Sequence, residues 1–168
     1  MDAVPGPQSE EAVNRAPPAL VAGVLAACSL AVPLISHYEG RPQRGYADVG
    51  GVPTSCYGHT GPDAVVGRVY TDDECARQLA QDAVAHGLDI AKCLPRDLPE
   101  PTRAAFTSFA FNVGAPRFCA SALSAKARAG DLKGACAELD RWVFAAGRKL
   151  PGLVARRAAE RELCEEGL

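Results

Sequence analysis

The amino-acid sequence predicts an α+β domain that is mostly helical and carries one small β-hairpin. Apolar residues recur at helical spacing through most of the chain. Two short runs, 46–49 and 52–57, flank Gly50-Gly51, a pair that can take the positive φ angles of a two-residue hairpin turn. The 168 residues are 48% apolar, which is enough for one core that can be pinched into two lobes.

The first residues, 1–17, contain Pro5, Pro7 and Pro17 together with acidic side chains. Such a stretch buries too little apolar surface to form a core. We therefore predict a flexible N-terminal lead-in and no packed structure before Pro18.

The next segment, 18–35, has no charged residue and approaches the length of a membrane span. Its five alanines, together with Gly23 and Ser29, make it only weakly hydrophobic, which disfavours a stable anchor. A cleaved secretory signal normally begins with a basic stretch, whereas this one is preceded only by Arg15. The four residues Leu25-Ala26-Ala27-Cys28 resemble a lipoprotein cleavage site. The residues alone leave these three alternatives open.

We expect the same apolar run to continue as a helix up to Glu39. Pro33 should interrupt the helix near its end, and Gly40 and Pro42 should stop it. Glu39 would then stand at the end of a packed helix, directly before the hairpin.

A helix is also predicted after the hairpin. Thr71 and Glu74 have the spacing of a capping box, which marks a helix start. Cys75 and Leu79 lie on one apolar face of this helix, and the pattern continues to about Ala91.

The following helix is introduced by Pro99 and Pro101 and ended by Gly114. Phe106 and Phe109 share its apolar face. We therefore expect both rings in the core rather than at a sugar-binding surface.

Three more helices complete the chain. Residues 116–129 and 131–142 are predicted as two helices separated by Gly130, with Trp142 among the buried positions. The last helix is expected over 151–166, because a proline stands in its first turn.

The sequence contains seven cysteines, many for a cytosolic protein of this size, and they lack the closely spaced pairs of a zinc site. We therefore expect an oxidising compartment. Three disulfides can form after Cys28, which would remain free. Cys119 with Cys136 is one candidate pair.

A net charge of −2 and a pI near 5.9 give no general attraction to nucleic acid. The arginines near the C-terminus alternate with glutamates, which is typical of a solvated face; a grip on an anionic polymer is the alternative. No His, Cys and Asp residues have the spacing of metal ligands, so neither a metal nor an organic cofactor is expected.

The residues that carry chemistry cluster around the hairpin. Glu39 is followed by Asp48 and then Thr54, with glycines between them. Cleavage of a glycosidic bond needs an acid for the leaving oxygen, a second carboxylate to stabilise the oxocarbenium ion or activate water, and a group that positions that water. The three residues suit these roles in turn. The apolar neighbours of Glu39, Leu34, Ile35 and Tyr38, would favour its neutral form.

Three ordered blocks carry a resemblance to a known family. The first is Glu39, Asp48 and Thr54 followed by Gly-His-Thr-Gly at 58–61; the others are 106–114 and 152–160. Together they resemble the phage lysozymes of glycoside hydrolase family 24, in particular the lambdoid-type endolysins.

This resemblance implies a lysozyme-like catalytic domain over 36–168, with a small hairpin lobe and a larger helical lobe. It implies a monomeric, exported, phage-encoded enzyme that acts on peptidoglycan without a cofactor. For residues 18–35 it implies a signal-anchor-release segment, which inserts in the host inner membrane and then leaves it for the periplasm.

Other residues receive roles with open alternatives. Tyr46, Tyr57 and Asn112 are expected to line the groove, although Asn112 can equally cap its helix. His59 is expected to pair with a carboxylate as a structural residue, and Arg156 and Arg157 are also expected to be structural. Asp48 as a turn cap and Thr54 as an ordinary strand residue are the alternatives to catalysis.

Two other functions suit the same residues. A lytic transglycosylase could end the reaction by intramolecular attack, and a non-catalytic module could bind the cell wall. The presence of both Asp48 and Thr54 favours hydrolysis.

Overall fold

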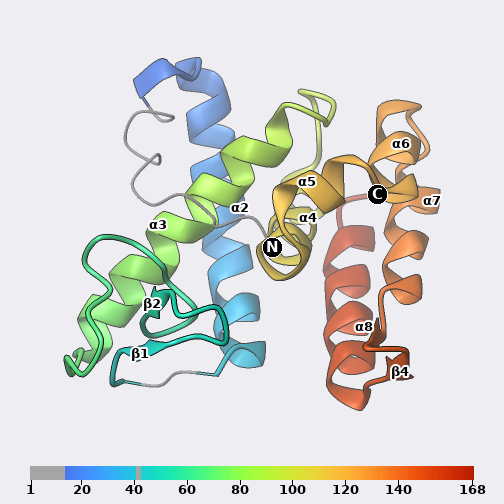
Figure 1. Cartoon of the computed structure of the whole chain (residues 1–168). Coiled ribbons are helices and arrows are strands. Elements are labelled where there is room, and N and C mark those ends of the chain that lie inside the picture. Colours follow the sequence, from blue (N-terminus) through green and yellow to red (C-terminus); the bar gives the residue numbers. More distant parts are fainter. Residues whose placement is uncertain (1–13, 41–42) are drawn as a thin grey trace.

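The computed structural model describes residues 14–40 and 43–168. Helices make up most of the molecule, and β1 and β2 lie beside one end of α3 (Figure 1). This confirms the predicted mostly helical α+β class. Most of the predicted lead-in, residues 1–13, lies outside the described residues.

In chain order the elements are α2 (Pro18–Tyr38), β1 (Tyr46–Ala47), β2 (Pro53–Thr54), α3 (Asp72–Ala91), α4 (Glu100–Val113), α5 (Ala115–Cys119), α6 (Ala122–Arg128), α7 (Leu132–Ala137), the 3₁₀ helix η1 (Glu138–Arg141), β3 (Phe144–Ala145), β4 (Arg148–Lys149) and α8 (Pro151–Glu165).

α2 is one continuous helix that joins the apolar segment to Glu39. It begins with Pro18, whose missing N–H costs nothing at the first helical position. Its last turn closes where the Glu39 N–H donates to the Ile35 carbonyl at 3.0 Å. One face packs against α3 and α4. The buried residues of this face are Val24, Ala27, Cys28, Ala31 and Ile35.

The expected interruption at Pro33 is wrong, because α2 continues through it. Pro33 lies on the exposed side of the helix. The Ser29 carbonyl loses its helical donor there, but water can replace that donor on an exposed face. Gly40 follows the helix end as predicted, and Pro42 lies outside the described residues.

β1 and β2 form the predicted antiparallel hairpin, with Tyr46 opposite Thr54. The strands are shorter than predicted, and the loop has three residues, 49–51, rather than two. Gly51 has a φ of 78°, and its N–H donates to the Asp48 carbonyl at 2.9 Å. A left-handed third residue is the usual ending of a three-residue hairpin loop.

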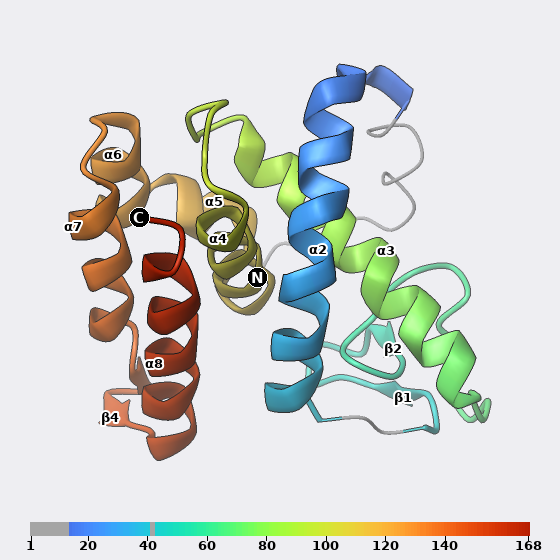
Figure 2. The same ribbon diagram turned by 180° about the vertical axis from the view of Figure 1, so that it is seen from behind.

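α3 begins at the predicted capping box. The Thr71 hydroxyl accepts the Glu74 N–H at 3.2 Å, and the Glu74 carboxylate accepts the Thr71 N–H at 2.8 Å. Seen from behind, α3 crosses from the side of β1 and β2 towards α4 and α5 (Figure 2). It therefore connects the hairpin lobe to the helical lobe.

α4 is the centre of the helical lobe. Phe106 and Phe109 are fully buried, as predicted, and the Phe118 ring lies 5.7 and 5.9 Å from their ring centroids. Trp142 packs edge-on against Phe109 at 5.1 Å. It was expected to be buried but is only partly covered.

The helix predicted over 116–129 is instead two helices, α5 and α6. The Ser121 hydroxyl caps α6 by accepting the Ser124 N–H at 3.1 Å. Serine favours helix ends over helix interiors, so this break had a signal that the pattern of apolar residues obscured. The helix predicted over 131–142 is also divided, since α7 gives way to η1 at Glu138.

The hairpin of β3 and β4 was missed, so the expectation of a single hairpin is wrong. Ala146 and Gly147 connect its strands with φ angles of 48° and 73°. Two positive φ angles are typical of a type I′ turn, which usually contains Asn or Asp before Gly. Alanine at that position carries no turn signal.

Three disulfides are present, as expected, and Cys28 is free and buried. The candidate pair Cys119 with Cys136 is wrong, because packing brings each of them to a different partner. The disulfides are Cys56–Cys75, Cys93–Cys119 and Cys136–Cys164.

Candidate active site

Glu39 lies one residue beyond α2, where its carboxylate meets α8. Arg156 Nη1 donates to Glu39 Oε1 at 2.6 Å, and Tyr38 Oη donates to the Ala155 carbonyl at 3.2 Å. The Glu39 side chain is 25% exposed, whereas that of Arg156 is 4% exposed. The expectation of an apolar setting alone is therefore wrong: a guanidinium from a distant part of the chain holds the carboxylate.

Arg156 is itself held by a buried polar cluster. Its Nε donates to Glu160 Oε1 at 3.1 Å, and its Nη2 donates to the Ser108 carbonyl at 3.3 Å. The Ser108 hydroxyl also donates to Glu160 Oε1, at 2.8 Å. Glu160 and the Ser108 carbonyl thus fix the guanidinium that holds Glu39.

Glu160 also offsets the positive charge of a second arginine, Arg157. Arg157 Nη1 lies 2.8 Å from Glu160 Oε2, and both side chains are essentially unexposed. Burial lowers the pKa of Arg157 to about 10 and raises the pKa of Glu160, while the attraction between opposite charges offsets part of each shift. With Glu39 and Arg156, the cluster contains two guanidinium groups and two carboxyl groups.

Arg157 orients the predicted groove residue Asn112. Its Nη2 donates to Asn112 Oδ1 at 2.6 Å, and its guanidinium lies over the Phe109 ring at 4.7 Å from the centroid. Because the amide oxygen is occupied, the exposed Asn112 presents its NH₂ group as a donor.

The hairpin brings Asp48 and Thr54 together around Val52. Asp48 Oδ1 accepts the N–H groups of Gly50 and Val52, both at 2.8 Å. The Val52 carbonyl accepts the Asp48 N–H at 3.0 Å and the Thr54 hydroxyl at 3.0 Å. Asp48 therefore caps the turn with one oxygen, and Oδ2 has no hydrogen-bond partner among the described residues.

No hydrogen bond or ion pair joins Glu39 to Asp48 or Thr54 within the part of the chain that the structure describes. Glu39 is placed by α2 and α8, whereas the other two residues are placed by the hairpin. The three predicted catalytic residues thus come from two separate parts of the chain, the end of α2 and the hairpin.

The two predicted groove tyrosines differ in access. Tyr46 lies on β1 opposite Thr54 and is 40% exposed. Tyr57 is partly buried and packs against the core clusters of both α2 and the hairpin lobe. Tyr46 is therefore the more accessible of the two.

His59 connects the hairpin lobe to α3. Its Nδ1 lies 2.9 Å from Asp82 Oδ2 and its Nε2 lies 2.8 Å from Asp63 Oδ1. Burial alone would lower the pKa of His59, but the two carboxylates outweigh it and raise the pKa to about 9. The ring is therefore positively charged at neutral pH and bonded at both nitrogens.

Sequence reasoning missed the supporting residues Ser108, Glu160 and Asp82. A signal existed for one of them, since Arg156 and Glu160 are four residues apart and lie on one face of a helix. Ser108 and Asp82 carry no local signal. Among residues 14–40 and 43–168, no group of three or more His, Cys, Asp or Glu side chains could hold a metal ion.

A glutamate at the end of a packed helix, a hairpin with an aspartate and a threonine, and a larger helical lobe define a lysozyme-type glycoside hydrolase. The Phage lysozyme family model matches residues 36–160. A SAR-endolysin of Bacteriophage PS119 is 45% identical over 126 residues, which are 75% of each chain. The chain therefore belongs to the phage lysozyme family.

A solved relative exists in two forms. The active form of the P1 phage endolysin Lyz has a TM-score of 0.69 at 27% identity, covering 80% of this chain and 82% of that chain. The secreted inactive form has a TM-score of 0.50 at 25% identity, covering 63% and 76%. The arrangement described above is therefore more similar to the active form.

By length and composition, α2 could cross a membrane. In the structure 28% of its most apolar window is buried. A core helix or a signal sequence has the same features, so this finding alone does not distinguish among them.

Proposed function

We propose that the protein hydrolyses the β-1,4 bond between N-acetylmuramic acid and N-acetylglucosamine in bacterial peptidoglycan. The observation that carries this proposal is the anchored but accessible carboxylate of Glu39. One of its oxygens accepts the 2.6 Å hydrogen bond from Arg156, and the side chain remains 25% exposed. An acid held at one oxygen can present its other oxygen to the glycosidic oxygen of a bound glycan.

Glu39 acts as the general acid, and Arg156 positions it. The guanidinium of Arg156 is shared with Glu160, which accepts from it at 3.1 Å. The planar fork of Arg156 keeps the carboxyl group of Glu39 in one orientation.

Asp48 and Thr54 act on the water. Asp48 Oδ1 is occupied by the turn, so Oδ2 is the oxygen that stabilises the oxocarbenium ion or activates water. The Thr54 hydroxyl donates to the Val52 carbonyl, so its oxygen is left to accept a hydrogen bond from the water and orient it.

Tyr46, Tyr57 and Asn112 bind the glycan on either side of Glu39. The tyrosines belong to the hairpin lobe, and Asn112 ends the apolar part of α4. The NH₂ group of Asn112 suits a sugar hydroxyl or an N-acetyl carbonyl, both of which accept hydrogen bonds.

α2 serves first as the export and anchoring segment. Relatives are named SAR-endolysins, and α2 is apolar enough to insert. When it leaves the inner membrane, its buried face packs against α3 and α4, and its end brings Glu39 to Arg156. The released periplasmic enzyme, acting as a monomer, then lyses the host cell.

Product mass tests the proposed reaction. Purified peptidoglycan digested by the protein should yield reducing N-acetylmuramic acid ends. A lytic transglycosylase would yield anhydro-sugar ends that are lighter by one water, and a cell-wall-binding module would release no fragments. Either result would overturn the assignment.

A further inference from the structure

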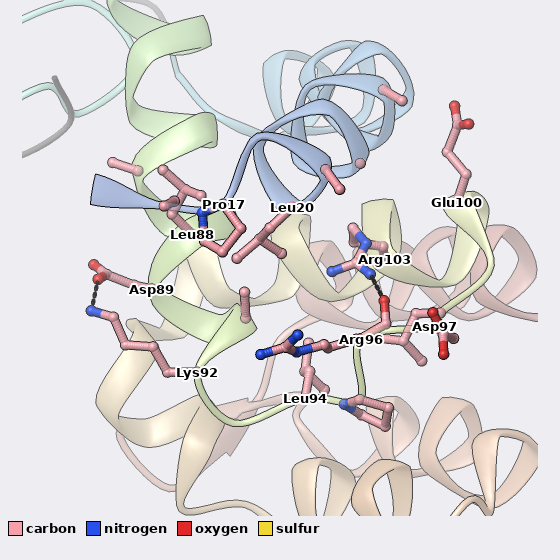
Figure 3. A pocket seen from close by; sticks show the side chains of 18 of the residues that line it. Pro17, Leu20, Leu88, Asp89, Lys92, Leu94, Arg96, Asp97, Glu100 and Arg103 are labelled. Atoms are coloured by element: carbon pink, nitrogen blue, oxygen red, sulfur yellow. Dashed lines mark hydrogen bonds and ion pairs between the residues drawn. The ribbon is translucent and has the colours of Figure 1, made fainter. Parts of the chain in front are cut away.

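A pocket lies at the N-terminal end of α2, at the opposite end of that helix from Glu39. Its cavity volume is about 1090 Å³. α2, the end of α3, the connection 92–99 and the start of α4 form its walls (Figure 3). The volume is at the upper end of the roughly 300–1,000 Å³ that is typical of small-molecule sites.

Much of the pocket wall is apolar. Leu20 and Pro17 face it from the α2 side, and Leu88 and Leu94 face it from α3 and the connection that follows. Gly23 also lines the pocket, and a Cβ atom added there would meet nothing within 4 Å. The apolar surface that α2 presents at this end is therefore not filled by described side chains.

One wall carries a buried guanidinium. Arg103, in the first turn of α4, is only 6% exposed. Its one side-chain hydrogen bond goes from Nη2 to the Arg96 carbonyl at 2.7 Å, and it has no ion-pair partner among the described residues. Burial lowers its pKa, and attraction to the Asp97 carboxylate offsets this only in part. Since a guanidinium has five N–H donors, most of its binding capacity remains unused.

The other charges around the pocket do not satisfy Arg103. Lys92 is paired with Asp89 at 2.7 Å on the opposite side. Arg96 is exposed and has no ion-pair partner in the described part of the chain. The rim also carries the exposed acids Asp97 and Glu100, and Arg15 adds a positive charge on the α2 side. A buried cation without a carboxylate is costly unless an anion joins it.

We propose that this pocket binds an anionic phospholipid, with the acyl chain against α2 and the phosphate at Arg103 and Arg96. The two halves of the pocket match the two halves of such a molecule. α2 is also the helix that is apolar enough to cross a membrane, so the pocket lies where a lipid carried along with it would remain.

The test is a calorimetric titration of the purified full-length chain with dihexanoylphosphatidylglycerol below its micelle concentration. We expect one molecule bound per chain. Arg103→Gln should weaken binding roughly tenfold or more, because a charge-assisted hydrogen bond is lost; Arg103→Lys should weaken it less. Gly23→Gln, which places a side chain in the open space, should also weaken binding. Arg148→Gln on the distant β4 serves as the control and should bind like wild type.

Separate titrations distinguish a lipid from other occupants. Inorganic phosphate alone and the zwitterionic dihexanoylphosphatidylcholine should each bind at least about tenfold more weakly. The proposal fails if phosphate binds as tightly as the lipid, or if Gly23→Gln leaves binding unchanged. It also fails if the wild-type chain binds no lipid but the Glu10→Gln, Glu11→Gln double variant binds it. That result would mean that the N-terminal residues, and not a lipid, occupy the pocket of the wild-type chain. If the Arg103→Gln variant does not fold, lipid binding by the Gly23→Gln variant tests the proposal instead.

Discussion

At the level of single residues, the site depends on a guanidinium that reaches Glu39 from α8. Arg156 is nearly unexposed, and it contacts Glu160 and the Ser108 carbonyl as well as Glu39. Removing one member of such a buried charge cluster leaves its partner uncompensated. The orientation of Glu39, the proposed general acid, is therefore tied to the stability of the helical lobe.

Replacing Glu39 by Gln should abolish most activity without unfolding the protein. The amide can still accept from Arg156 but cannot donate the required proton, so the rate should fall by roughly 10²-fold or more. Activity on purified cell walls and thermal unfolding would be measured together. Glu162→Gln, on the exposed side of α8, is the matched control. If Glu39→Gln kept more than about a tenth of wild-type activity, Glu39 would not be the general acid.

Arg156→Lys should reduce turnover more than substrate binding. Lysine keeps the charge but cannot contact Glu39, Glu160 and the Ser108 carbonyl at once, because it lacks the planar fork. We expect a fall in kcat with little change in KM, and a shifted pH profile of kcat. A change confined to KM would instead assign Arg156 to substrate binding.

At the level of elements, His59 is the main polar link between the hairpin lobe and α3. Its side chain is 11% exposed and bonded to Asp82 and Asp63. Gln78 strengthens the same link, since it donates to Asp63 at 2.8 Å and accepts from the Ser55 hydroxyl at 2.9 Å. The small lobe that carries Asp48 and Thr54 is thus held by polar contacts as well as by its disulfide.

Because of the His59 link, the folded protein should lose stability as the pH becomes alkaline. The folded pKa of about 9 lies above the ordinary value of 6.5, so folding holds the proton more tightly. The stabilisation is complete below pH 6.5 and is lost as pH rises through about 9; it amounts to about 3 kcal/mol. Urea unfolding at pH 6 and pH 9.5 would measure it. In His59→Gln the difference between the two pH values should shrink by that amount, and an unchanged difference would contradict the assignment.

The stability of the hairpin lobe should also depend on its disulfide. Its core cluster consists of Cys56, Tyr70 and Cys75, so the Cys56–Cys75 disulfide is part of the core itself. Removing a native disulfide typically costs about 2–5 kcal/mol. In the double variant Cys56→Ala, Cys75→Ala, amide exchange in β1 and β2 should accelerate more than in α4. Equal exchange in both regions would show that the lobes do not unfold separately.

At the level of the whole molecule, the proposed membrane insertion would give α2 a second position that is incompatible with the packed one. Its buried residues are part of the core shared with α3 and α4, and the same residues would face lipid in a membrane. The three disulfides join residues between 56 and 164, so no cross-link ties α2 to the domain. The helix can therefore move from one position to the other without breaking a disulfide.

Added leucines on the exposed face of α2 should keep the protein in the membrane. Ala22 and Ser29 are exposed in the folded molecule, so leucine there adds apolar area for lipid, at roughly 25 cal/mol per Å², without crowding the core. The Ala22→Leu, Ser29→Leu variant should remain in the membrane fraction and lyse cells later than wild type. Ala22→Gln, Ser29→Gln is the control and should be released. Lysis at the wild-type rate by membrane-bound protein, or a wild-type chain cut after Ala27, would refute the release mechanism.

Local features of the sequence determined much of the secondary structure. The α3 capping box, the glycine after α4, the proline at the start of α8 and the apolar faces of α2 and α4 each act within a few residues of where they stand. The order of Glu39, Asp48 and Thr54 around a glycine turn is a local pattern of the same kind, and the catalytic roles assigned to these residues from it remain a prediction. Local signals failed at the Ala146-Gly147 turn, where the first residue was atypical, and at Pro33, which an exposed helix face tolerated; at Ser121 the pattern of apolar residues obscured the break between α5 and α6.

Only the tertiary structure decided the contacts between distant segments. The bond from Arg156 to Glu39, the pairing of His59 with Asp82, and the partners of Cys119 and Cys136 depend on how helices pack, and no periodicity records which side chains meet across a core. The environment of Glu39 is the clearest case. Its sequence neighbours are apolar, but the group that holds its carboxylate is a charged side chain brought there by the packing of α8 against α2 and α4.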